Sequence, residues 1–159
     1  FVDSAGDAVS VGSLFSSVKL LRPRRTLLVV GSVEGASGKS RFDLGRVGGE
    51  FADHVVLTSD NPGTEAMSEI CTAIAQGLEQ SQRCTYHIQA DREQAIRDLI
   101  SMTEPGDVAL ILGKGEKTYQ IIGNTICPFS DREVAGECLQ SLPGAPLPVR
   151  TNSLPLIAA

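Results

Sequence analysis

The 159-residue chain has no tryptophan, only two histidines and four cysteines, and few aromatic residues of any kind. The cysteines are widely scattered, with no C-x-x-C pair and no histidine at metal-ligand spacing, so the sequence gives no support to a structural zinc site. The histidines lie in strand-like contexts and the chain has no nucleophile elbow, which argues against a Ser/His/Asp triad. We therefore expect reduced thiols that pack as small apolar groups at Cys71, Cys84, Cys127 and Cys138.

Long apolar runs and an excess of basic residues are also missing. No stretch approaches the roughly 18 to 20 uncharged apolar residues of a membrane helix, and the first residues do not form the basic and then apolar pattern of a signal peptide. The net charge of −5 argues against a broad basic surface for DNA or anionic membranes. The local basic cluster at residues 19–25 is interpreted as the end of a solvated helix. We expect a cytoplasmic protein that binds neither nucleic acid nor a membrane.

Helix-like and strand-like hydrophobic periods alternate along the chain, which is typical of βαβ units on a mostly parallel sheet. The expected fold class is therefore α/β, with helices flanking that sheet. A chain of this length forms one compact domain, which we place at residues 1–142, before an irregular proline-rich tail over residues 143–159. Strands are predicted near residues 26–30, 55–58, 84–88 and 108–112, a hairpin at 119–129, and helices over about 8–22, 41–52, 64–78, 91–101 and 131–142.

A glycine-rich segment, GASGKS at residues 35–40, follows a predicted buried strand and precedes a helix, as a phosphate-binding P-loop does. The full P-loop pattern requires a glycine at the position of Val33, and without it the loop lacks the tight turn that aims its N–H groups at a phosphate. We therefore interpret the segment as a solvent-exposed loop. A helix N-terminus there could still bind an anion weakly.

Polar residues follow two of the predicted strands and should meet at one edge of the sheet. Asp60 and Asn61 come directly after one strand, and Lys114 follows another. Open α/β sheets bind their ligands at this carboxyl edge. A carboxylate and an amide suit the ammonium and polar groups of an amino acid, and a lysine suits a carboxylate or phosphate. The alternatives are a local Asx turn and a solvated loop lysine. Nothing identifies a general acid or base, so catalysis wholly within this chain is not expected.

Several short segments carry a family resemblance through their order and spacing. They are VLTSDNPGTE at residues 56–65, DREQAI at 91–96, GDV at 106–108, GKG at 113–115, YQ at 119–120 and FSDRE at 129–133. Together they resemble the C-terminal domain of the ATP-dependent Mur ligases, in the branch that adds the third residue of the peptidoglycan stem peptide. The resemblance covers about residues 1–142 and implies a Rossmann-like sheet.

The resemblance implies a three-domain ligase in which this domain closes over a central domain that binds ATP and Mg²⁺. The reaction would form an acyl phosphate on the D-glutamate of UDP-MurNAc-L-Ala-D-Glu, which the amine of a diamino acid then attacks. The partners would be this UDP-MurNAc-dipeptide, the diamino acid, and the N-terminal and central domains. The isolated chain should be inactive and hold no metal. The family's site residues fall at Asp60, Asn61, Pro62, Gly63, Gly113 and Lys117 for the substrate and at Asp3 for the nucleotide.

Departures from the family pattern leave two hypotheses open. Arginines that grip the distal carboxylate of diaminopimelate in relatives correspond to Gly63 and Ala36, and a glutamate corresponds to Lys117. The opening motif has Ser4 and Gly6 in place of tyrosine and histidine. The chain is then either a ligase domain whose substrate lacks the second carboxylate, such as lysine or ornithine, or a catalytically degenerate homologue that serves as a structural or interaction module.

Overall fold

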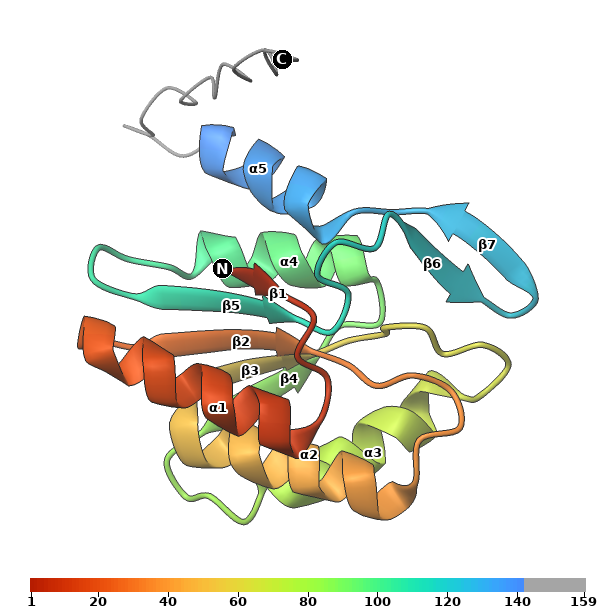
Figure 1. The fold of residues 1–159 in the computed structure, drawn as a ribbon, viewed down its shortest axis with the longest axis horizontal. Helices are drawn as coiled ribbons and strands as arrows, with labels where there is room; N and C mark the ends of the chain where they lie inside the picture. The colour runs from red at the N-terminus through yellow and green to blue at the C-terminus, as the bar shows by residue number, and fades with distance from the viewer. Residues whose placement is uncertain (142–159) are drawn as a thin grey trace, which may run out of the picture.

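The computed structural model describes residues 1–141, so the predicted tail over 143–159 lies outside the described residues. A five-stranded, fully parallel sheet with strand order β1-β5-β2-β3-β4 forms its centre (Figure 1). The strands are β1 (Val2–Asp3), β2 (Thr26–Val30), β3 (His54–Leu57), β4 (Thr85–Ile88) and β5 (Val108–Leu112), with an antiparallel hairpin of β6 (Tyr119–Ile122) and β7 (Thr125–Pro128). The helices are α1 (Ala8–Val18), a 3-10 turn (Lys19–Leu21), α2 (Gly38–Phe51), α3 (Met67–Leu78), α4 (Arg92–Ser101) and α5 (Asp131–Ser141).

Helices cover both faces of the sheet, as the alternating pattern predicts. In Figure 1, α1, α2 and α3 lie on one side and α4 and α5 on the other. Successive residues of a strand point to opposite faces, so Leu28 and Val30 pack with the first group of helices while Leu27 and Val29 pack with the second. Because both faces are covered, β2 is buried along its whole length. The Rossmann-like α/β prediction is confirmed.

Two predicted helix boundaries are wrong. Helix α2 begins at Gly38 rather than near residue 41, because Ser37 caps it by accepting a hydrogen bond from the Ser40 amide. Helix α3 begins at Met67 rather than near residue 64, and no side chain caps it, although Thr64 is a residue type that often caps helices. The Thr64 amide and hydroxyl are instead engaged by Glu34, from a different loop. A long-range contact has replaced the local cap.

The glycines of α2 lower its intrinsic helix propensity, but they allow its backbone to pack closely against α3. A Cβ atom on Gly45 would clash with the Ile74 carbonyl of α3, and one on Gly77 of α3 would clash with the Phe42 carbonyl of α2. The two backbones therefore approach more closely than any larger residue would allow. The close contact of α2 with α3 compensates for the weak local propensity.

A fully enclosed ion pair connects α4, α5 and the carboxyl edge of the sheet. The Arg92 guanidinium donates from Nε and Nη2 to the two carboxylate oxygens of Asp131, at 2.8 and 2.7 Å, and neither side chain is exposed. It also donates to the carbonyls of Ser59 (3.2 Å) and Leu112 (2.9 Å), which lie at the ends of β3 and β5. Arg92 thereby fixes α5 against the ends of the strands from which the site loops depart.

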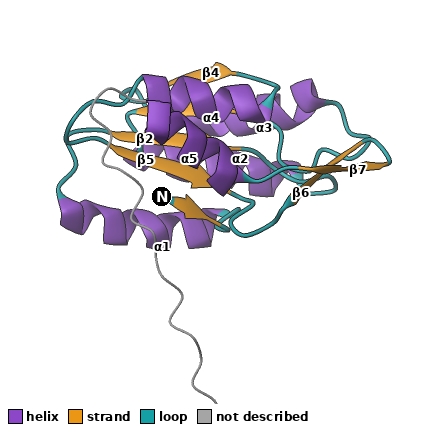
Figure 2. Cartoon of the chain, turned by 90° about the horizontal axis from the view of Figure 1, so that it is seen from above, coloured by secondary structure: helices purple, strands orange, loops and turns teal. Residues whose placement is uncertain are grey.

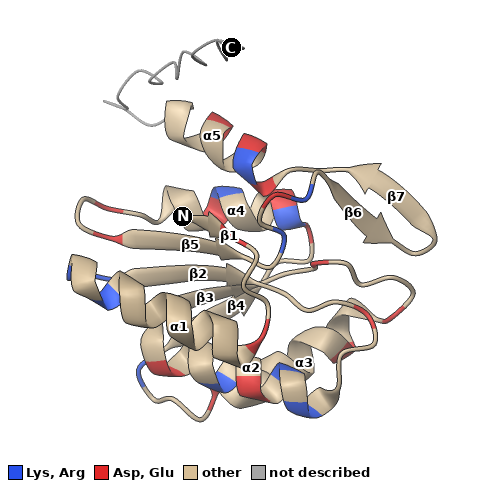
Figure 3. Cartoon of the chain, in the orientation of Figure 1, with Lys and Arg blue, Asp and Glu red and all other residues tan. Residues whose placement is uncertain are grey.

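The basic cluster near residues 19–25 is not simply the end of a solvated helix. Arg24 and Arg25 follow the 3-10 turn and lead into β2, and both pair with Asp107, at 3.1 and 2.6 Å. The two guanidinium groups hold the pKa of that carboxyl well below its usual range. In the cartoon of Figure 3, positions with basic residues alternate with positions with acidic residues along several elements. No helix within residues 1–141 is both long and apolar enough to cross a bilayer.

All four cysteines are free thiols, as expected. Cys71 is fully buried among the apolar side chains between the sheet and α1–α3. Burial disfavours the thiolate and raises the pKa of the Cys71 thiol to about 11. This residue is part of the core and has none of the features of a reactive cysteine.

Candidate functional site

The loops that leave the carboxyl ends of β2, β3 and β5 lie together, beside the β6–β7 hairpin (Figure 1). Figure 2 shows the hairpin extending beyond this end of the sheet. The parallel topology forces this arrangement, because the strands all point the same way. The predicted convergence of Asp60 and Asn61 with Lys114 is therefore present.

Lys114 is the centre of this cluster and is completely buried. Its ammonium donates to Asn61 Oδ1 at 2.8 Å and to the Tyr119 carbonyl at 3.2 Å. It also lies 3.1 Å from Asp60 Oδ1, where the hydrogen-bond alignment is poor and the contact is mainly electrostatic. Burial lowers the pKa of Lys114, and the nearby Asp60 charge partly opposes that shift. The alternative of a solvated loop lysine is wrong, since Lys114 neutralises a carboxylate of the protein itself.

Asn61 joins the loop after β3 to the hairpin. Its Oδ1 accepts from the Ile121 amide at 3.0 Å as well as from Lys114. Gln120 reinforces the connection by donating to Ser59 Oγ (2.8 Å) and to the Asp60 carbonyl (2.9 Å). These partners are about sixty residues away in sequence, so the side chain does not form the local Asx turn that was the alternative. Asp60 is only 3% exposed, which makes it a residue that positions this loop.

Gly63 and Gly113 both hold backbone conformations that favour glycine, with φ of +55° and +112°. The Gly63 carbonyl accepts from the Gly123 amide at 2.7 Å, which fixes the segment after Pro62 against the hairpin turn. A Cβ atom on Gly113 would lie 2.8 Å from Asp60 Oδ2. Gly113 therefore leaves room for the Asp60 side chain, which packs across it.

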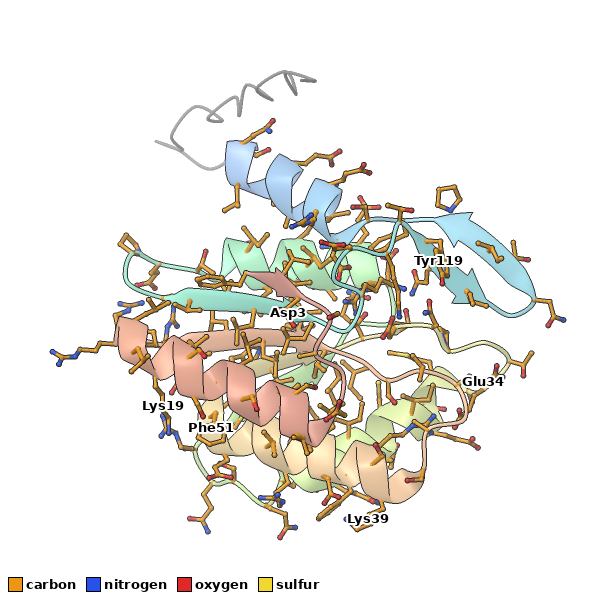
Figure 4. All side chains as sticks on the ribbon, viewed as in Figure 1. Asp3, Lys19, Glu34, Lys39, Phe51 and Tyr119 are labelled. Atoms are coloured by element: carbon orange, nitrogen blue, oxygen red, sulfur yellow. The ribbon has the colours of Figure 1, made fainter. Side chains whose placement is uncertain are left out.

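The GASGKS segment is divided between an exposed loop and the start of α2. Gly38 to Ser40 form the first turn of α2, and Lys39 pairs with Asp43 one turn along on the exposed face of that helix. Ala36 is half-buried in the preceding loop. The position of Lys39 at the solvent-facing end of α2 is visible in Figure 4. The interpretation as an exposed loop holds for Gly35, whereas residues 38–40 belong to the helix.

Arg41 is a structural residue of the site that the sequence did not reveal. It is 5% exposed and donates to both carboxylate oxygens of Glu65, at 2.5 and 2.7 Å, and to the Val33 carbonyl at 3.0 Å. This pairing ties the β2–α2 loop to the loop after β3. Glu65 belongs to the segment at residues 56–65 that carries the family resemblance. Its partner Arg41 lies 24 residues earlier in the chain, and no local sequence pattern indicates that the two residues pair.

Asp3 and Lys117 lie in a separate cavity of about 430 Å³, on the β1 side of Lys114. One carboxylate oxygen of Asp3 accepts from the Ala5 amide at 2.8 Å. Lys117 therefore groups with the predicted nucleotide residue, not with Asn61 and Gly63. Within residues 1–141 there is no group of three or more acidic, histidine or cysteine side chains placed to hold a metal ion. The cavity is lined by Val2, Asp3, Ser4, Lys114, Gly115, Glu116, Lys117 and Arg132.

Comparison with known proteins matches this arrangement to one family. Residues 1–115 fit the family model described as "Mur ligase, glutamate ligase domain". The UDP-N-acetylmuramoyl-L-alanyl-D-glutamate–2,6-diaminopimelate ligase of Caldanaerobacter subterraneus is 36% identical over 139 residues, covering 87% of this chain and 29% of the relative. The ligase of the same name from Clostridioides difficile is 43% identical over 115 residues, covering 70% of this chain and 24% of the relative.

A solved structure of a ligase with that same name superimposes with a TM-score of 0.80 at 26% identity, covering 87% of this chain and 28% of the other. The chain spans less than a third of the length of each of these relatives. The matched part is the domain with the parallel sheet and the loop cluster described above. The chain therefore belongs to the Mur ligase family and forms its glutamate ligase domain.

Proposed function

We propose that the chain is the C-terminal domain of an ATP-dependent ligase that adds a diamino acid to UDP-MurNAc-L-Ala-D-Glu in cytoplasmic peptidoglycan synthesis. Its role there is to close the active site and bind the incoming amino acid. The observation that carries the proposal is the cluster at the carboxyl edge, where Lys114 holds Asn61 beside Gly63. Relatives with diaminopimelate ligase names support the reaction class.

The cluster orients Asn61 for a ligand. Lys114 and the Ile121 amide are both donors, so the atom they contact is the amide oxygen. The Asn61 amide nitrogen is then a donor with no hydrogen-bond partner among residues 1–141. Because its amide oxygen is fixed by these two hydrogen bonds, the Asn61 amide nitrogen is positioned to donate to the carboxylate of an amino acid. Asp60 and Lys114 act in this proposal by fixing Asn61 and make no contact with the ligand themselves.

The substrate class follows from what surrounds Asn61. Positions 36 and 63 carry Ala36 and Gly63, neither of which has a cationic side chain to pair with a second carboxylate. We therefore propose L-lysine or L-ornithine in place of diaminopimelate. Specificity of this kind is a difference between two affinities, and the loss of paired arginines removes the attraction that favours diaminopimelate.

For the nucleotide, the cavity with Asp3 has a suitable set of groups. A carboxylate can accept hydrogen bonds from sugar hydroxyls, while Lys117 and Arg132 can pair with phosphate oxygens. ATP would bind mainly to the central domain, with Asp3 contributing from this side when the domains close. The described residues lack a ligand set for Mg²⁺, so we assign that ion to the central domain as well.

The alternative is a degenerate homologue that serves as a structural or interaction module. One observation favours it: Lys117 lines the cavity with a positive charge at a position where the family pattern has a glutamate. The carboxylate that the family pattern offers to the substrate amine is therefore missing at this position. The two functions differ in whether any amino acid is turned over.

Phosphate release from ATP by the complete protein tests the proposal directly. The assay contains Mg²⁺ and UDP-MurNAc-L-Ala-D-Glu, with lysine, ornithine, meso-diaminopimelate or no amino acid. We expect stimulation by an amino acid, and no ATP turnover by residues 1–159 alone. A folded complete protein that no amino acid stimulates would rule out the ligase function and favour the interaction module. ATP turnover by the isolated chain would overturn the assignment of ATP and Mg²⁺ binding to the central domain.

A further inference from the structure

Glu34, which is labelled in Figure 4, lies on the β2–α2 loop. Its carboxylate lies next to Gly63. Its amide donates to the Asn61 carbonyl at 2.9 Å. Its Oε1 accepts from the Thr64 amide at 2.8 Å and from the Thr64 hydroxyl at 2.7 Å. A Cβ atom built on Gly63 would clash with Oε2 and Cδ of Glu34. The Glu34 carboxylate therefore fills the space in which any side chain at position 63 would begin.

Glu34 differs from the neighbouring carboxylates because no basic side chain of the described residues pairs with it. Asp60 is paired with Lys114 and Glu65 with Arg41, whereas Glu34 forms no ion pair within residues 1–141. The hydrogen bonds from Thr64 hold the pKa of the Glu34 carboxyl below its usual range, so it is ionised at neutral pH. Oε2 accepts no hydrogen bond from the described residues. One oxygen is used to fix the side chain, and the other is left as an acceptor.

We propose that Glu34 is a specificity-determining residue for the distal end of the incoming amino acid. Oε2 accepts a hydrogen bond from the terminal ammonium of a lysine-like side chain, and the negative charge repels a second carboxylate such as that of diaminopimelate. The inference rests on the proposed function and deepens it. Loss of the arginines removes an attraction, whereas Glu34 adds a repulsion, and specificity is strongest when both act.

The position of Glu34 relative to Asn61 supports this assignment. The two residues are joined by a backbone hydrogen bond, so the acceptor Oε2 and the donor of Asn61 belong to one rigid assembly. An amino acid whose carboxylate is bound by Asn61 can then extend its side chain toward Glu34. An exposed ion pair contributes little by itself, but a fixed partner in a site closed by another domain is less screened.

The test uses the complete protein with Glu34→Gln, since glutamine keeps the oxygen that accepts from Thr64 and removes only the charge. We expect KM for lysine or ornithine to rise about tenfold with kcat little changed, which is the loss expected for one charge-assisted hydrogen bond. The preference for these amino acids over meso-diaminopimelate should fall by at least as much. The matched control is Glu50→Gln, at an exposed carboxylate near the end of α2 whose one ion pair within residues 1–141 is with Arg46, and this variant should change neither value.

The outcomes separate this inference from the proposed function. Wild-type turnover with lysine or ornithine, combined with an unchanged KM and an unchanged preference in Glu34→Gln, would overturn the role of Glu34 and leave the ligase function standing. A wild-type protein that no amino acid stimulates would overturn both. An equal thermal unfolding midpoint for wild type and Glu34→Gln shows that any KM change reflects binding.

Discussion

The Arg92 guanidinium lies against the Asp131 carboxylate in a fully enclosed, two-point contact that joins helices α4 and α5. A buried charge that loses its partner keeps its full desolvation cost. Arg92 also donates hydrogen bonds to the Ser59 and Leu112 carbonyls, which follow or end β3 and β5. The pair therefore stabilises the starting points of the site loops, although neither of its side chains reaches the surface.

Removing one member of the pair should be strongly destabilising. We expect Asp131→Ala to lower the free energy of unfolding by about 3 to 5 kcal/mol, because Arg92 is left as an uncompensated buried charge. The control is Glu137→Ala on the same helix, whose solvent-exposed pair with Arg97 should contribute far less to stability. Urea unfolding of the two variants gives the comparison, and similar losses for both would contradict the burial argument.

The glycine contact between α2 and α3 makes a second prediction. Gly45→Ala raises intrinsic helix propensity yet places a methyl group onto the Ile74 carbonyl, so we expect a loss of about 2 kcal/mol or more. Among residues 1–141, no atom lies within 4 Å of the methyl group that Gly136→Ala adds in α5, so this variant should gain about 0.5 to 1 kcal/mol. Thermal unfolding measures both, and a stabilised Gly45→Ala variant would show that the helices can move apart freely.

Buried Cys71 predicts how stability depends on pH. Its thiol has a pKa of about 11 in the folded chain, against an ordinary value of 9.0. Above the ordinary value the unfolded chain loses this proton first, so the free energy of unfolding falls as pH rises from about 9 to about 11. We expect Cys71→Ala to lack this component, so its deficit relative to wild type should shrink by roughly 2 kcal/mol between about pH 8 and about pH 10.5. A deficit that stays constant over this range would contradict the shifted pKa.

Position 63 allows the substrate preference to be changed by design. Gly63→Arg alone places its Cβ onto Glu34 and puts a non-glycine residue at a φ of +55°, so we expect reduced stability and little gain in diaminopimelate use. The double variant Glu34→Gly with Gly63→Arg clears that space and replaces a negative charge by a positive one. The ratio of kcat/KM for meso-diaminopimelate to that for lysine should rise about tenfold or more in the double variant. An equal rise in the single variant would show that Glu34 does not control access to this position.

The strands and the edge that carries the site could be predicted from sequence because both follow from local patterns. An unbroken apolar run such as residues 26–30 indicates a strand buried on both faces, and parallel strands bring their following loops to one edge. The segment at residues 56–65, which resembles the family, also indicated Asn61 and Gly63 as candidate site residues. These predictions required no knowledge of which side chains meet.

The contacts that give the site its chemistry could not be predicted, because each depends on two distant segments. The sequence is equally compatible with an exposed Lys114 in a solvated loop. The structure buries Lys114, and its ammonium donates a hydrogen bond to the Tyr119 carbonyl of the hairpin. Thr64 resembles a helix cap, but Glu34 engages both of its donors. The assignment of Lys117 to the substrate followed the family pattern, whereas the structure places it in the cavity with Asp3. That substrate role, like the other binding roles, remains a prediction.

The specificity proposed for this domain is for an amino acid without a second carboxylate. The most direct test is the ratio of kcat/KM for lysine or ornithine to kcat/KM for meso-diaminopimelate, measured with the complete protein, ATP, Mg²⁺ and UDP-MurNAc-L-Ala-D-Glu. We expect a preference of about tenfold or more for lysine or ornithine, because the Glu34 carboxylate repels the second carboxylate of diaminopimelate and positions 36 and 63 carry no cationic side chain that attracts it. A ratio near one, or a preference for meso-diaminopimelate, would contradict it.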